Sequence, residues 1–195
     1  MLPYEVVVEN GVLVRVKTEG CYKDGTFCMY RDVTSIADSA RYDLREITPC
    51  KIMVENGGAF VSDGRCILSR TGGNLYLGFN DSMIPPRTKV IKRGAFAYSG
   101  NNRHLLIPSH VSRVESFAFA NNVGGLSRYY FEGSPELGEC VFGTKKEKEL
   151  ASGKLPEFEG MPYTDNKNFV VLAKPGSSVE EYCKKYGIKF EAVKD

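Results

Sequence analysis

The chain has 195 residues, of which 42% are hydrophobic and 26% are charged, and its formal net charge is +2. This length fits one domain or one short repeat array, and the composition is that of a folded globular protein. The small, dispersed charge argues against a nucleic-acid partner, and no apolar run approaches the roughly 18–20 residues needed for insertion into a membrane.

The first 28 residues are predicted to form a β-hairpin at one end of the fold. Valine-rich runs at 6–8 and 12–14 flank Asn10-Gly11, a dipeptide typical of a tight type I′ turn. A stacked repeat needs such a cover, because its terminal unit otherwise exposes its apolar side. We therefore expect an N-terminal hairpin cap at 1–28.

Segment 29–83 is predicted to be rich in short strands. Two stretches share apolar spacings of three and seven residues, which we interpret as a degenerate first repeat: Val33, Ile36 and Ala40, and Val111, Val114 and Ala118. Arg41 stands where the later units carry Phe. Apolar runs at 52–54, 59–61 and 66–68 are separated by glycine-containing turn signals, a pattern that predicts successive strands with tight turns.

The segment 84–142 repeats with a fixed step of 23 residues. An Ile-Pro pair at 84–85 recurs at 107–108 (107 − 84 = 23), and three aromatic residues keep the same step: Phe96, Phe119 and Phe142. Such self-similarity is typical of stacked repeats that bury equivalent side chains against their neighbours. We expect Phe96 and Phe119 to be deeply buried, one above the other.

The C-terminal part is predicted to contain a charged loop or short helix at 144–168 and a closing unit at 169–195. A lysine- and glutamate-rich run at 145–149 precedes several Pro and Gly residues, which favours a solvated segment. A strand at 169–172 is followed by a helix that begins near Ser177 or Ser178 and ends at Gly187. Its apolar stripe consists of Val179, Tyr182, Cys183 and Tyr186, and a last strand follows at 188–190.

The repeated unit resembles that of a known family. Residues 107–119 read Ile-Pro-x-x-Val-x-x-Val-x-x-x-Ala-Phe, and 84–96 follow the same pattern with Thr88 in place of the first valine. This motif resembles the repeat of BspA-like leucine-rich-repeat proteins, as do the strand-turn pattern at 52–64, the final unit at 129–133 and the closing segment 175–190. The resemblance covers roughly residues 29–195.

Together, these patterns predict a β-rich α+β fold in a single repeat domain, 1–195. The expected architecture is a short leucine-rich-repeat solenoid with an N-terminal hairpin cap at 1–28 and a repeat array with a strand-rich insertion at 29–143. A charged loop at 144–168 and a C-terminal strand–helix–strand cap at 169–195 complete it.

Cysteine and histidine spacing predicts no metal site and no cofactor. The six cysteines contain no Cys-x-x-Cys pair, and His104 and His110 lie far from most of them in sequence. Free thiols are favoured over disulfides, because a chain of this length can build a core without cross-links. No secretory signal is recognisable at the N-terminus, which favours a cytoplasmic protein unless a leader has been removed. The family resemblance instead implies secretion or the cell surface.

Strand alternation predicts one outward face on the repeats. If Leu105 and Ile107 point inward, their neighbours point outward, and the repeat step extends this face to the units before and after. The candidate binding residues are Met83, His104, Leu106, Arg128 and Tyr130.

An exposed apolar stripe often marks a protein contact, and no nucleophile–base arrangement is recognisable in the sequence. We therefore expect a non-enzymatic protein that binds a protein partner of unknown identity, and the family resemblance implies adhesion or contact with a host protein. The alternative is a structural or self-assembling protein that uses the stripe as a homodimer contact. A third reading is that segment 143–168 folds back over the stripe.

Overall fold

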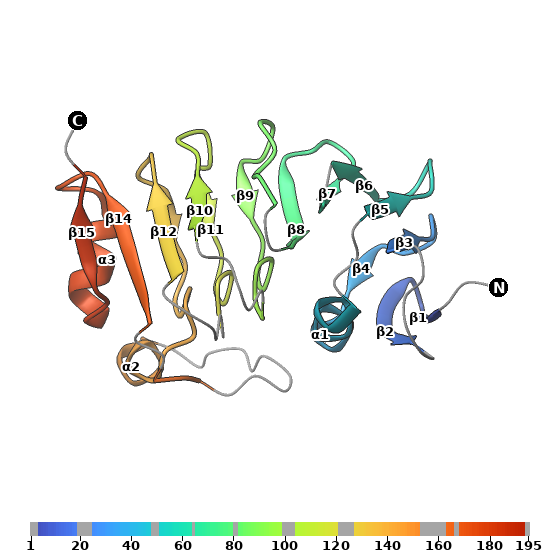
Figure 1. Cartoon of the computed structure of the whole chain (residues 1–195), viewed down its shortest axis with the longest axis horizontal. Helices are drawn as coiled ribbons and strands as arrows, with labels where there is room; N and C mark the ends of the chain where they lie inside the picture. The colour runs from blue at the N-terminus through green and yellow to red at the C-terminus, as the bar shows by residue number, and fades with distance from the viewer. Residues whose placement is uncertain are drawn as a thin grey trace.

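The computed structural model arranges the chain as a row of short strands, with the N-terminus at one end and the C-terminus at the other (Figure 1). Helix α1 lies in the N-terminal half of this row, whereas α2 and α3 lie in the C-terminal half. The structure describes residues 4–18, 25–47, 51–63, 65–79, 82–98, 104–120, 127–152, 163–165 and 168–193.

The N-terminal part combines a helix with two small sheets. Its elements are β1 (Tyr4–Glu9), β2 (Val12–Thr18), β3 (Thr26–Met29), β4 (Ser35–Ile36), α1 (Asp38–Ile47) and β5 (Lys51–Val54). Strands β1 and β2 pair as an antiparallel hairpin around Asn10 and Gly11, whose φ angles are 50° and 78°. Both residues thus adopt the left-handed conformation that a type I′ turn requires. Strand β4 pairs in parallel with β2, and β3 pairs in parallel with β5.

A six-stranded sheet forms the middle of the molecule. Its strands are β6 (Phe60–Asp63), β7 (Cys66–Ser69), β8 (Asn74–Gly78), β9 (Val90–Ile91), β11 (Arg113–Val114) and β13 (Glu136–Leu137). Strands β6, β7 and β8 are antiparallel neighbours, whereas β8, β9, β11 and β13 follow one another in parallel. Arg113 pairs with Val90 on one side and with Glu136 on the other, so the 23-residue step sets the register of these strands.

A four-stranded parallel sheet forms the C-terminal part, in the order β10, β12, β14, β15. The elements here are β10 (His104–Ile107), β12 (Ser127–Phe131), α2 (Lys145–Leu150), β14 (Phe169–Ala173), α3 (Ser178–Tyr186) and β15 (Phe190–Ala192). Helix α3 connects β14 to β15, and such a crossover is what parallel neighbouring strands require.

The largest cluster of buried side chains contains the phenylalanines of the 23-residue step. Phe96 and Phe119 are 0% and 1% exposed, and their ring centroids lie 6.0 Å apart with planes inclined by 34°. The rings of Phe119 and Phe142 are 5.7 Å apart. The predicted burial of Phe96 and Phe119 is therefore confirmed, and the rings form a tilted ladder that links three successive units.

Strands β7 and β8 lie between this cluster and a second one in the N-terminal part. Leu68 and Leu75 belong to the larger cluster, whereas Ile67 and Leu77 belong to the smaller. Ile67 and Leu68 are consecutive on β7 and so face opposite sides, and the register shift between them pairs Ile67 with Leu77 and Leu68 with Leu75. The two strands therefore join the N-terminal part to the rest of the chain.

The turns after β9, β11 and β13 share one backbone conformation. Gly94, Phe117 and Cys140 stand 23 residues apart (117 − 94 = 23; 140 − 117 = 23), and their φ angles are 67°, 59° and 54°. In each turn the N–H three residues further on donates to the carbonyl of this residue, at 3.1, 3.1 and 3.2 Å. Phe117 and Cys140 adopt the left-handed region despite a Cβ, at a cost of roughly 1–2 kcal/mol each.

Local capping explains the ends of α2 and α3. The Ser177 hydroxyl accepts from the Glu180 N–H at 3.3 Å, and Gly187 ends α3 with φ 63°. The predicted apolar stripe of α3 is buried. Thr144 and Glu147 form a reciprocal capping box at the start of α2. The described part of 144–168 therefore contains a short helix rather than only a charged loop.

The expected fold class is wrong. The chain is not a β-rich α+β leucine-rich-repeat solenoid with two caps; it is a mixed α/β fold with parallel and mixed sheets and, among the described residues, three helices. Strands are divided over four sheets in the described part, and α1 occupies positions where a degenerate repeat was expected. The physical reason is that the 23-residue step operates only between 84 and 142, so a local periodicity does not dictate the rest of the chain.

Candidate functional site

The outward face of β10 and β12 carries four of the five predicted binding residues. Leu105 and Ile107 are buried, whereas His104 and Leu106 are exposed, Leu106 by 46%. On β12 the burial pattern alternates in the same way, and Arg128 and Tyr130 are half-buried. The alternation expected from the sequence thus holds on both strands.

The strand register places the apolar members of this face in one row. Leu106 pairs with Tyr130 across β10 and β12, and Tyr130 pairs with Leu172 across β12 and β14. Neighbouring strands lie about 4.8 Å apart, so these three side chains are adjacent; we call Leu106, Tyr130 and Leu172 the outward row. His104 pairs with Arg128 in the parallel row beside it.

Met83 is not brought into the outward row. It is 88% exposed and belongs to no strand, and β10 pairs only with β12 among the described residues. Its carbonyl instead accepts a hydrogen bond from the Cys66 thiol at 3.6 Å. The repeat step does not hold at Met83, because residues 82–89 form no strand.

Leu172 is the member of the row that sequence reasoning missed. A strand at 169–172 was expected, and alternation with the buried Val171 places Leu172 outward. The signal was present in the sequence, but the 23-residue step does not reach β14.

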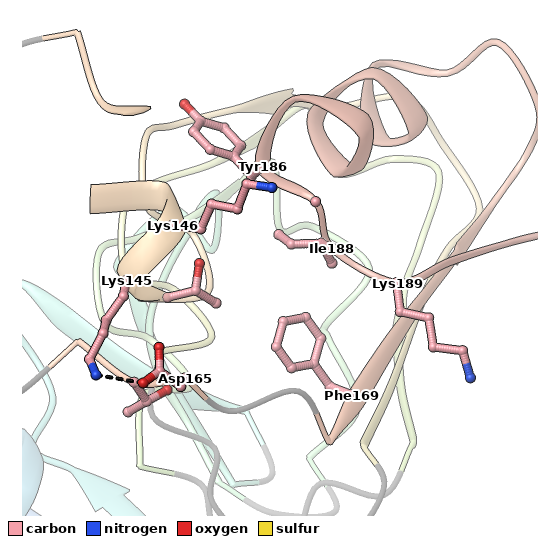
Figure 2. Close-up of a pocket in the computed structure, with 10 residues that line it drawn as sticks. Lys145, Lys146, Asp165, Phe169, Tyr186, Ile188 and Lys189 are labelled. Atoms are coloured by element: carbon pink, nitrogen blue, oxygen red, sulfur yellow. Dashed lines mark hydrogen bonds and ion pairs between the residues drawn. The ribbon is translucent and has the colours of Figure 1, made fainter. Parts of the chain in front are cut away.

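A second candidate site is a pocket of about 340 Å³ between α2, the start of β14 and the link from α3 to β15 (Figure 2). Its apolar side is formed by Phe169, Tyr186 and Ile188, and three lysines, two threonines, Asp165 and Gly187 complete the lining. Figure 2 shows Phe169 and Ile188 on one side of the pocket, and Lys145 with Asp165 on the other. Lys145 Nζ and Asp165 Oδ2 are 2.5 Å apart.

Buried carboxylate Glu147 lies on α2 beside this pocket, but its contacts are internal. Its Oε1 accepts from the Phe142 N–H at 3.1 Å and from the Tyr182 hydroxyl at 2.5 Å, and its Oε2 accepts from the Thr144 N–H at 2.6 Å. Burial raises the pKa of Glu147, although these hydrogen bonds oppose the rise. All of its contacts serve to hold α2 against α3 and the turn before α2.

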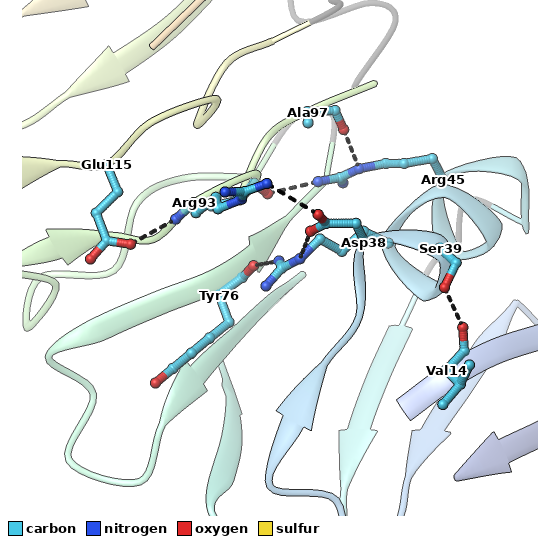
Figure 3. A network of polar contacts seen from close by, with 10 residues as sticks. Val14, Asp38, Ser39, Arg45, Tyr76, Arg93, Ala97 and Glu115 are labelled. Carbon is cyan, nitrogen blue, oxygen red and sulfur yellow. Dashed lines mark hydrogen bonds and ion pairs between the residues drawn. The ribbon is translucent and has the colours of Figure 1, made fainter. Parts of the chain in front are cut away.

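A network of polar contacts joins α1 to the middle of the molecule (Figure 3). Arg45 donates from Nε to the Ala97 carbonyl at 2.8 Å and from Nη2 to the Ala95 carbonyl at 2.7 Å, and its Nη1 bonds the Gly78 carbonyl. Burial lowers the pKa of Arg45 to about 9. Because its fork is occupied by main-chain carbonyls, Arg45 is a structural tie and not a ligand group.

Asp38 extends this network from the start of α1. Its two oxygens lie 3.7 Å from Arg41 Nε and 3.4 Å from Arg93 Nη2. Arg41 also bonds the Tyr76 carbonyl, and burial lowers the pKa of Arg41 to about 10. The contacts of these charged side chains therefore hold α1 against the six-stranded sheet.

Within the described residues, His, Cys, Asp and Glu form no group of three that could hold a metal ion. No helix in that same part of the chain is long and apolar enough to cross a membrane.

Neither a known protein-family model nor a curated protein matches this chain. One solved structure, that of the pneumococcal vaccine antigen PcpA, is similar with 11% sequence identity and a TM-score of 0.35. The match covers 87% of this chain and 56% of that one, so this chain spans little more than half the length of PcpA. A TM-score this low supports no conclusion about fold or function.

Proposed function

We propose that this chain is a non-enzymatic protein-interaction module that binds a protein partner through the outward row. The observation that carries the proposal is the register of Leu106, Tyr130 and Leu172, which places three apolar side chains next to one another on an outward sheet face. Leu106 is 46% exposed, and contiguous apolar surface of this kind often marks a contact site.

The chemistry of the face suggests what the partner offers. His104 and Arg128 lie beside the row and supply hydrogen-bond donors next to apolar surface. Tyr130 sits at the centre of the row, and tyrosine combines a large apolar ring with a polar tip, a combination enriched in interface anchors. A partner segment with apolar side chains and an acidic group fits this arrangement.

The buried polar groups support a binding role over a catalytic one. Arg45 and Glu147 both make contacts within the protein that hold its elements together. The resemblance to BspA-like proteins adds the expectation of adhesion or contact with a host protein at the cell surface. Fractionation of the source cells tests that location: recovery in the cytoplasmic fraction would contradict it.

Replacement of Tyr130 by Ala tests the proposal. Partner binding should weaken by about 1–3 kcal/mol, whereas the melting temperature should barely change because the side chain faces outward. Tyr30→Ala is the matched control, since Tyr30 is 37% exposed and follows β3 at the opposite end of the row of strands. If both variants bind the partner as the wild type does, the outward row is not the contact surface.

The second candidate function is self-association through the same row. Strand β10 is an edge of its sheet in the described part of the chain, and an edge beside an apolar face favours pairing between copies. Light scattering over a range of protein concentrations separates the two functions. A wild-type dimer that Tyr130→Ala dissociates supports self-association, whereas a monomer at every concentration supports an external partner.

A further inference from the structure

We propose that the pocket between α2 and the α3–β15 link binds a small amphipathic carboxylate, with one anionic group and an apolar ring or short chain. The pocket is distinct from the outward row, and its occupancy does not depend on the proposed protein partner. The charge of the pocket, its apolar side and its size all favour this class of ligand.

Charge pairing leaves one lysine available for an anion. Three lysines line the pocket. Lys145 Nζ is 2.5 Å from Asp165, and Lys189 Nζ is 3.5 Å from Glu191. Lys146 forms no ion pair within 4.0 Å among the described residues. One uncompensated ammonium group matches a single negative charge.

The position of Lys146 directs its charge to the pocket edge. A Cβ added at Gly187 would lie 2.6 Å from Lys146 Nζ, so the amine of α2 reaches across to the end of α3. Thr144 also lines the pocket; its hydroxyl oxygen accepts from the Glu147 N–H at 3.2 Å, and its O–H is a hydrogen-bond donor. An anion held here therefore meets the ammonium group of Lys146 and the hydroxyl of Thr144 within one lining.

The other side of the pocket is apolar. Phe169 and Tyr186 are 8% and 2% exposed, and Ile188 is half-buried and packs against the main core. Figure 2 shows the Phe169 ring and Ile188 facing the space that Lys145 and Lys146 border. Specific pockets commonly combine an apolar lining with a few placed polar groups, and about 340 Å³ is near the lower end of their size range. That volume suits one ring or a short chain.

Lys146 has a purely structural alternative role, because a cation near the C-terminal end of a helix is favourable. The two roles predict different outcomes for Lys146→Gln. If Lys146 has only a structural role, the substitution lowers the melting temperature and leaves ligand affinity unchanged. If Lys146 binds the ligand, the substitution lowers ligand affinity.

Isothermal titration calorimetry with phenylacetate tests the binding role. Acetate carries the carboxylate without the ring, and benzyl alcohol carries the ring without the charge. Phenylacetate should bind saturably and more tightly than either part, and Lys146→Gln should weaken it at least about tenfold. Lys184→Gln is the matched control, since Lys184 pairs with Glu180 at 2.8 Å and does not line the pocket; it should bind like the wild type. Absence of saturation at millimolar phenylacetate, equal affinity for acetate, or unchanged affinity in Lys146→Gln would each overturn the proposal.

Discussion

Replacing Arg45 with Met should lower the free energy of unfolding by about 3 kcal/mol. The side chain is 8% exposed and donates to the carbonyls of Gly78, Ala95 and Ala97. Three bonds from a charged donor contribute roughly 1.5–3 kcal/mol each, and the cost of burying the guanidinium offsets several kcal/mol of that sum. Methionine fills much of the volume but leaves three carbonyls without this donor.

Urea unfolding followed by circular dichroism measures the effect, since the chain contains no Trp for fluorescence. Arg113→Met is the control: that side chain is 52% exposed and lies 4.0 Å from Glu136, so its loss should change stability by less than about 0.5 kcal/mol. Arg45→Lys should recover only part of the loss, because one ammonium cannot reproduce the planar fork. Equal midpoints for the Arg45→Met and Arg113→Met proteins would refute the reasoning.

Further predictions concern the core, a buried acid and the thiols. Gly78→Ala places a Cβ 2.3 Å from the Phe96 ring and should cost about 1–3 kcal/mol in urea unfolding; Phe119→Ala should cost about 3–5 kcal/mol by the same measurement. Burial raises the pKa of Glu147, so its stabilising contribution is full below the unfolded pKa of about 4.3 and is lost as pH rises through the folded pKa. The wild type should therefore lose stability relative to Glu147→Gln between acid and neutral pH, and parallel pH profiles would contradict this. The three buried described thiols have raised pKa values of about 11 to 12 because of burial, so a thiol reagent should label them slowly in the native protein and fully in urea; fast native labelling would show that they are accessible.

Some of the fold could be predicted because its causes are local in sequence. Asn10-Gly11 specifies a hairpin turn by its own backbone preference, and the stripe of α3 follows from helical spacing. The burial of Phe96 and Phe119 follows from the 23-residue step, since equivalent positions of neighbouring units meet in one core. Each of these features needs only information within about one repeat.

The rest depends on groups distant in the chain. Arg45 is separated by 52 residues from Ala97 and by 33 from Gly78, and nothing in residues 38–47 specifies those carbonyls. Ala40 and Leu44 are both buried, and their spacing of four residues is helical. The charged residues around them make this apolar pattern weak in the sequence. The outward-facing residues of β10 and β12 could be predicted because the repeat step applies to both strands. The same prediction is wrong for Met83, because the step does not correspond to a strand there.

The unequal spacing of the parallel strands has a consequence for the order of folding. Paired residues on β10 and β12 are 24 positions apart (128 − 104 = 24), whereas those on β12 and β14 are 42 apart (169 − 127 = 42). Closing the longer loop costs about 0.5 kcal/mol more, before Phe169 can stack on Phe142 at 4.9 Å. We therefore expect β14 to join after the transition state, so that truncating Phe169 accelerates unfolding while truncating Phe119 slows folding.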